Sequence, residues 1–82
     1  MDQNLHDRHI SALKLGFDGD FGGSIASLKQ LSKENPDDVE IIYDLAMTEM
    51  LLGQFEEACD HLKQVLAKDP AHAKALQQVT YC

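Results

Sequence analysis

Cysteine is scarce in this sequence, and no segment is apolar enough to suggest a membrane span. The 82 residues include only Cys59 and Cys82, which could form at most one disulfide and do not resemble the dense bridges of secreted scaffolds. We therefore expect Cys59 to be an inert thiol in a reducing compartment. No apolar run approaches the ~18 residues of a membrane helix. The amino terminus has neither the basic head nor the apolar run of a secretory signal, so a cytoplasmic location is expected.

Basic residues are also few. Seven Lys and Arg residues stand against 14 Asp and Glu residues, which gives a net charge of -7. Such a chain repels phosphate backbones and anionic lipid surfaces, so we expect no nucleic acid and no membrane among its partners. Another protein or peptide that is neutral, apolar or basic is the expected partner. The short chain has room for one domain with a modest core, too little for a catalytic domain with a separate substrate lobe.

The spacings that catalysis or metal binding needs are missing. Cys59 is not part of a Cys-x-x-Cys redox pair, and Gly22-Gly23 lacks the preceding strand and following Lys-Ser or Lys-Thr of a phosphate loop. His6 and His9 could share a helix face, but Cys59 and His61 could not, so a four-ligand zinc site is not indicated. We expect solvated or capping histidines, no metal, no cofactor and no enzymatic activity.

The sequence does contain an internal repeat, with a period of 34 residues. Its matches fall at glycine turns, at apolar positions and at the ends of units. The matched segments are Gly19-Asp20-Phe21 with Gly53-Gln54-Phe55, Leu28-Lys29-Gln30-Leu31 with Leu62-Lys63-Gln64-Val65, and Asn35-Pro36 with Asp69-Pro70. Each unit carries apolar residues at three- and four-residue spacing on both sides of a glycine turn, so each is predicted to be a helical hairpin.

The predicted fold class is all-α, with two helical hairpins and a closing helix in one domain, residues 1–82. Helices are expected at about 4–17, 20–34, 37–52, 55–68 and 71–81, with repeat 1 at about 4–36, repeat 2 at about 37–70 and a capping helix at about 71–82. Asp37 and Glu40 have the spacing of a capping box. Phe21 and Phe55 are expected to anchor the core. In the last helix the residues expected to face inward are Ala75, Leu76 and Val79.

These features resemble the tetratricopeptide repeat family. The second unit has the family's signature positions at Ile42, Leu45, Ala46, Gly53, Phe55, Ala58, Leu62, Val65 and Pro70. The first unit departs from the pattern at Arg8 and Ser11, which occupy normally apolar places. That leaves its first helix frayed, shifted in register or exposed as an end cap. The resemblance implies an interaction scaffold whose concave face is lined by the first helix of each unit.

The predicted helix at 37–52 is apolar on two sides, whereas a stack of helices needs one apolar stripe for its core. The two stripes are Ile42, Leu45 and Ala46, and Tyr43, Met47 and Met50. Under the resemblance the second stripe faces the concave side, where thioethers could adapt to a peptide or helix of a partner protein. The partner-binding residues expected in this groove are His9, Leu13, Phe17, Tyr43, Met47, Met50, Gln77 and Tyr81.

Two alternatives remain open for the second stripe: it could belong to the core, or it could be a self-association surface. A self-assembling, homo-oligomeric scaffold is the alternative function, through the groove or the exposed helix ends, because such repeats usually need about three units to bury a continuous core. Some members of the family bind carboxylate tails of chaperones through cationic and amide groups. Here those places hold His9, Leu13, Asp44 and Met47, so a carboxylate-tail ligand is not expected.

Overall fold

The computed structural model describes residues 2–82, with side chains from residue 4 onward; Met1, which the predicted domain includes, lies outside them. The described residues contain no strand, and all five predicted helices are present. The helices are α1 (Asp2–Phe17), α2 (Phe21–Glu34), α3 (Val39–Leu51), α4 (Phe55–Lys68) and α5 (Ala73–Val79). The all-α prediction is therefore confirmed.

Glycine makes the two hairpin turns possible. Gly19 and Gly53, at equivalent positions of the repeat, have φ angles of 94° and 83°. This left-handed conformation is costly for residues with a Cβ atom but open to glycine. The chain therefore reverses direction between α1 and α2 and between α3 and α4.

The helices α3 and α5 begin later than predicted because different residues cap them. Asp38, not Asp37, caps α3: its carboxylate accepts the backbone N–H groups of Glu40 (3.2 Å) and Ile41 (3.4 Å). Asp37 is exposed and accepts a bond from Lys68 at 3.1 Å. Helix α5 starts after His72, whose Nδ1 accepts the backbone N–H of Ala75 at 3.1 Å. The predicted capping box at Asp37 and Glu40 is thus wrong by one residue.

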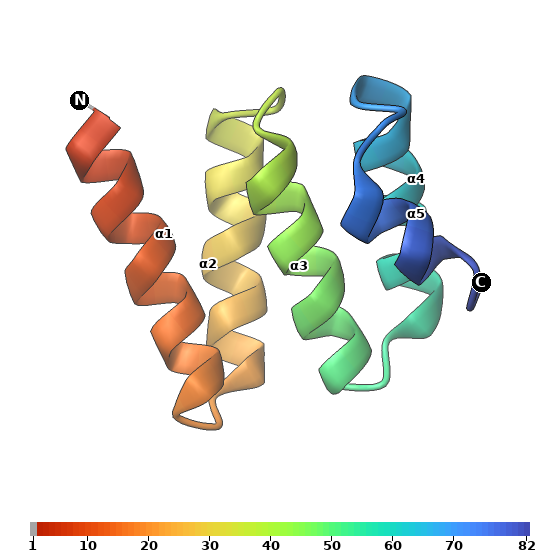
Figure 1. The fold of residues 1–82 in the computed structure, drawn as a ribbon. Coiled ribbons are helices and arrows are strands. Elements are labelled where there is room, and N and C mark those ends of the chain that lie inside the picture. The colour runs from red at the N-terminus through yellow and green to blue at the C-terminus, as the bar shows by residue number, and fades with distance from the viewer. Residues whose placement is uncertain (1) are drawn as a thin grey trace.

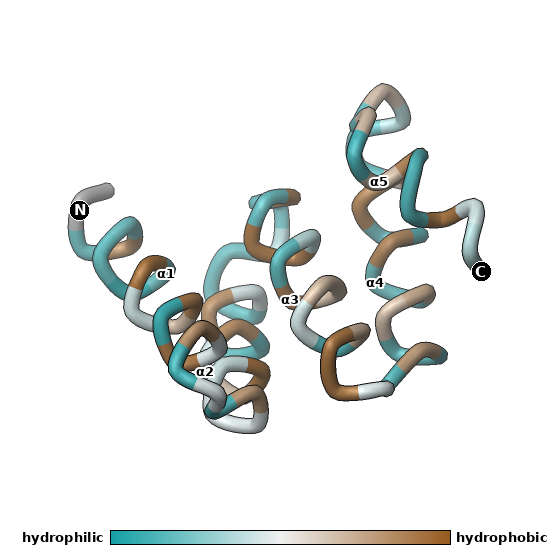
Figure 2. The backbone as a smooth tube through the Cα atoms, turned by 60° about the horizontal axis from the view of Figure 1, so that its bottom comes forward, coloured by the Kyte–Doolittle hydropathy of each residue, from teal (hydrophilic) through white to brown (hydrophobic). Residues whose placement is uncertain are grey.

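The helices form two layers, with α1, α3 and α5 in front of α2 and α4 in the view of Figure 1. Neighbours in sequence run antiparallel, as the short connections between them require. Apolar and polar positions recur along each helix, as the alternating brown and teal of the tube in Figure 2 shows. Each helix therefore buries one side against its neighbours.

Two core clusters lie on opposite sides of α3. The first joins α1, α2 and α3 through Ala12, Ile25, Leu28, Leu31, Ile41 and Leu45. The second joins α3, α4 and α5 through Ile42, Ala46, Ala58, Leu62, Val65 and Ala75. Since α3 supplies two residues to each cluster, it is the one helix that connects both halves of the core among the residues described.

Two predicted core residues are exposed instead. Phe55 is 63% exposed and Leu76 is 46% exposed, although the repeat pattern placed both inward. Helix α5 stops at Val79, the counterpart of Leu45, whereas α3 continues to Leu51. Among residues 2–82, therefore, no turns of helix cover Phe55, and no second helix packs over Leu76. Phe21, the counterpart of Phe55, is half-buried.

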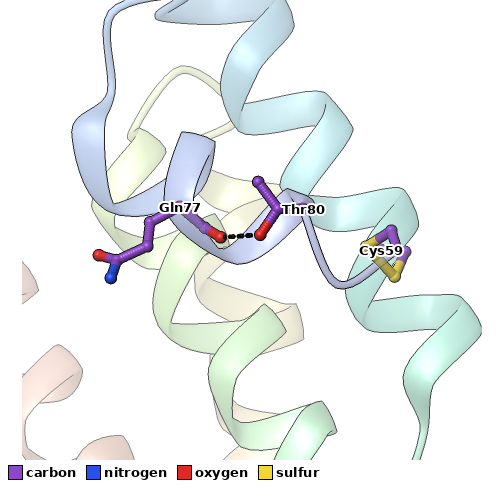
Figure 3. Close-up of a disulfide and its surroundings, with 4 residues drawn as sticks. Cys59, Gln77 and Thr80 are labelled. Atoms are coloured by element: carbon purple, nitrogen blue, oxygen red, sulfur yellow. Dashed lines mark hydrogen bonds between the residues drawn. A yellow bond between two sulfur atoms is a disulfide. The ribbon is translucent and has the colours of Figure 1, made fainter.

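Cys59 and Cys82 form a disulfide with a Cα–Cα distance of 5.9 Å, so the expectation of an inert thiol at Cys59 is wrong. The bond ties the chain end to the second turn of α4 (Figure 3). Just before it, the hydroxyl of Thr80 donates to the carbonyl oxygen of Gln77 at 2.7 Å, which closes the last turn of the chain.

Candidate partner-binding face

Helix α3 presents the side chains that make the front layer a candidate interaction surface. Tyr43, Met47 and Met50 are half-buried: one side of each packs against the second core cluster, and the rest is open to solvent. Leu13 of α1 is also half-buried and packs against the first cluster. We call these four residues, with His9, the front face. They come from two neighbouring helices of one layer (Figure 1).

His9 links the two helices of this face. Its Nε2 lies 2.7 Å from Oδ2 of Asp44, and both side chains are largely buried. Burial raises the pKa of the Asp44 carboxyl, and the hydrogen bond with His9 opposes that rise. The pair fixes α1 against α3 and leaves a carboxylate of low solvation beside the apolar stripe.

A second histidine contact links α3 to α5. Nε2 of His72 lies 2.8 Å from Oε2 of Glu40, and the His72 ring packs against Tyr43 with a centroid distance of 5.2 Å. Burial raises the pKa of the Tyr43 hydroxyl, with further contributions from Asp44 and Glu40, so Tyr43 is a neutral hydrogen-bond donor at neutral pH. The aromatic side chain is thus held in place and offers a polar tip, as interface tyrosines commonly do.

A third contact lies in the core. Nδ1 of His61 on α4 is 2.6 Å from Oε1 of Glu49 on α3, and Glu49 is 0% exposed. Burial raises the pKa of Glu49, and its Oε2 atom has no hydrogen-bond partner. Three of the four histidines therefore bond carboxylates of α3, whereas the fourth, His6, is exposed.

No local sequence pattern indicates these contacts, because the paired residues are 35, 32 and 12 positions apart. The histidines were expected to be solvated or capping, and only His72 has a capping role. The packing of α3 against α1, α4 and α5 brings each pair together. One hint was present: α3 carries three acidic residues and no basic residue.

Three other predicted binding residues lie at or beyond helix ends or on the open side of α5. Phe17, the last residue of α1, is 86% exposed. Gln77 is exposed on α5. Tyr81 follows α5, is 79% exposed, and lines a cavity with Phe55 and Cys59 at the start of α4 rather than joining Tyr43. The structure therefore gathers Tyr43, Met47 and Met50 on the second core cluster, bonds His9 to Asp44 of the same helix, and packs Leu13 on the first cluster. It places Tyr81 elsewhere.

A separate hollow of about 620 Å³ lies between α1 and α2. It is lined by Asp7, Arg8, Ser11, Ala12, Leu15, Ala26, Ser27, Gln30 and Leu31. Arg8 spans its rim and donates to both carboxylate oxygens of Glu34, at 2.6 and 3.0 Å. Arg8 is the counterpart of Ile42 in the second repeat, but it is exposed, as Ser11 is. Arg8 and Ser11 therefore belong to a solvent-facing surface rather than to the core.

Two hairpins related by a 34-residue repeat, stacked in two layers around a shared central helix, define a helical-repeat protein of the kind that binds other proteins. The chain belongs to the tetratricopeptide repeat family, because the family model described as Tetratricopeptide repeat matches residues 18–79. Membership in this family supports a protein–protein interaction module.

The chain is also similar to a curated protein, Tetratricopeptide repeat protein 37 of Xenopus laevis. The two are 28% identical over 64 residues, which cover 78% of this chain and 4% of that protein. The chain thus spans a small part of this relative's length. Among residues 2–82, no helix combines the length and apolar character needed to cross a bilayer.

Proposed function

We propose that this chain is a protein–protein interaction module that binds a peptide or helix of a partner protein on the front face. The observation that carries the proposal is the second stripe of α3. Ile42, Leu45 and Ala46 are buried in the core, yet Tyr43 and Met47 remain half-exposed on the same helix. Adaptable methionine and rigid tyrosine side chains are frequent at protein interfaces.

The charges around the front face favour a neutral, apolar or basic partner. Glu40 is exposed at one edge, and Asp44 stands beside Tyr43. Helix α3 has no basic residue, and the chain as a whole has a net charge of -7. A lysine or arginine of the partner could compete with His9 for Asp44, whereas an acidic peptide would be repelled.

The alternative is a self-assembling scaffold that uses the same face or the exposed ends of the array. The exposed side chain of Leu76 favours self-assembly, because no helix among residues 2–82 covers it as α4 helps to cover its counterpart, Ile42. A second copy would bring the same negative charge, which opposes this pairing at low ionic strength. The solution mass separates the two functions.

The test replaces Tyr43 and Met47 together by serine. A peptide ligand is first selected from a random displayed library against the intact chain, and its Kd is then compared between the two proteins. Affinity should fall at least about tenfold, because buried aromatic anchors commonly dominate an interface. Helicity should persist with a stability loss of about 1.5–3 kcal/mol, about half of the full-burial value for each of the two half-buried side chains.

Leu51→Ser is the matched control, because Leu51 is an exposed apolar residue at the end of the same helix. It should leave the Kd unchanged. Collapse of the circular dichroism signal in the double variant would assign the stripe to the core. A drop in sedimentation mass from dimer to monomer with helicity intact would support the self-assembling alternative.

A further inference from the structure

The carboxyl-terminal end of the helix stack holds a cavity that the front face does not use. It measures about 500 Å³ and lies beside the disulfide, at the first turns of α4. Its lining is formed by Phe55, Glu56, Cys59, Asp60, Lys63, Tyr81 and Cys82. Both aromatic residues of this lining are exposed, at 63% for Phe55 and 79% for Tyr81. We call this site the end seat.

The repeat itself indicates what shape fits the end seat. Helices α2 and α3 are antiparallel and joined only by residues 35–38, so the last two turns of α3 lie beside the first turns of α2 (Figure 1). There Phe21 is half-buried and Ile25 is buried. Their counterparts, 34 residues on, are Phe55 and Cys59, both of which line the end seat.

In the second repeat the covering turns are absent. Helix α5 ends at Val79, so it lies along the second half of α4 and stops short of Phe55. Only the short segment from Tyr81 to Cys82 reaches the first half of α4, held there by the disulfide. The end seat is therefore the place where the repeat geometry positions about two turns of helix, and no helix among residues 2–82 occupies it.

The charge of the lining favours one kind of occupant. Glu56 and Asp60 contribute two carboxylates and Lys63 one ammonium, and Glu57 adds a further carboxylate next to them in sequence. A second copy of the chain would bring a net charge of -7 to this acidic surface. A helix with one apolar face and basic flanks satisfies both the aromatic and the acidic parts of the lining.

We propose that the end seat is a second docking site, which binds two turns of a basic amphipathic helix from a partner protein. Phe55 and Tyr81 contact the apolar face of that helix, and Glu56 and Asp60 pair with its cations. The site is independent of the front face, since none of the front-face residues lines it.

The chain's own α3 suggests a probe, because α3 occupies the equivalent place on α2. The probe is a synthetic peptide with the sequence of residues 39–52 in which Glu40, Asp44 and Glu49 are replaced by lysine. It is titrated at low salt into the oxidised protein, and binding is followed by amide chemical shifts. The largest changes should map to Phe55, Cys59 and Tyr81.

The protein variants make the assignment specific. Phe55→Ala should weaken binding of the lysine-containing peptide at least about tenfold while helicity is kept. Phe17→Ala removes another exposed phenylalanine, at the other hairpin turn, and should leave the Kd unchanged. The Tyr43→Ser and Met47→Ser double variant should also leave it unchanged, so failure of the front face and failure of the end seat give different results.

Four results would overturn the proposal. The first is an unchanged Kd in Phe55→Ala, and the second is a set of shift changes centred on Tyr43 and Met47. The third concerns the peptide with the natural acidic residues, which should bind at least about tenfold more weakly than the lysine-containing peptide. Equal binding of the two peptides would show that the site does not select a basic helix. A dimer of the protein alone that Phe55→Ala converts to a monomer would instead make a second copy the occupant.

Discussion

Two substitutions in α4 test how the core is built. Leu62→Ala removes a fully buried side chain of the second cluster and should cost about 2–5 kcal/mol, the usual range for buried leucine. Full burial of a phenylalanine side chain stabilises a fold by about 1.5–3 kcal/mol. Phe55 keeps 63% of its surface exposed, so only about a third of that, roughly 0.5–1 kcal/mol, is lost in Phe55→Ala.

The measurement is urea unfolding of both variants, followed by circular dichroism at equal protein concentration. A domain of this size has about 5 kcal/mol of stability, so Leu62→Ala should be partly or wholly unfolded and Phe55→Ala should be folded. If Phe55→Ala lowers the unfolding free energy as much as Leu62→Ala does, then the Phe55 side chain is covered in solution, and its exposure in the structure is wrong. Concentration-dependent stability of the parent protein would identify a second copy as the cover.

Three further predictions concern charge and the disulfide. The Arg8 hydrogen bonds lower the pKa of Glu34 to about 2. The stability from this pair is therefore complete above the ordinary carboxyl pKa of 4.5 and is lost as the pH falls through about 2. In Arg8→Ala the Glu34 pKa, measured by carbon NMR, should return toward 4.5. The opposite sign applies to Glu49, whose pKa is raised by burial: its ionised form costs stability at neutral pH, and this cost disappears as the pH falls through the folded-state pKa. His61→Ala should raise that pKa further, and the same NMR titration showing a fall would refute this cause. The disulfide closes a loop with a sequence separation of 23, so reducing it should lower the unfolding free energy by about 3 kcal/mol. Urea unfolding curves with and without a phosphine reductant measure this difference. An unchanged midpoint would mean that the bond does not constrain the unfolded chain.

Much of the fold was predictable because periodicity reports local structure. The hairpins follow from the glycine turns, and the buried positions Ala58, Leu62 and Val65 follow from helical spacing. Phe55 and Leu76 have the same spacing but are exposed, since no helix among residues 2–82 packs over them. A pattern states which side of a helix is apolar, and only the neighbouring helices decide whether that side is covered.

The candidate site was only partly predictable for a related reason. The stripe of Tyr43, Met47 and Met50 could be read from one helix. Tyr81 was placed beside it because the last helix was predicted to run to residue 81. The helix ends at Val79 and the disulfide draws Tyr81 toward α4, a tertiary constraint that no local pattern encodes.

Helix α3 explains why the two hairpins act as one unit. Each core cluster is completed by residues of α3, and each of its acidic residues bonds a histidine from a different neighbour: α1, α4 or the start of α5. Separating the two hairpins would expose Ile41 and Leu45, the side of α3 that packs against α1 and α2, and would leave Asp44 without its partner His9. Uncovering that apolar surface and removing the partner of a largely buried carboxylate both lower a stability that is small in a domain of this size. The front face is therefore built on the helix that has the least freedom to move, so its side chains are ordered before a partner arrives and less entropy is lost on binding.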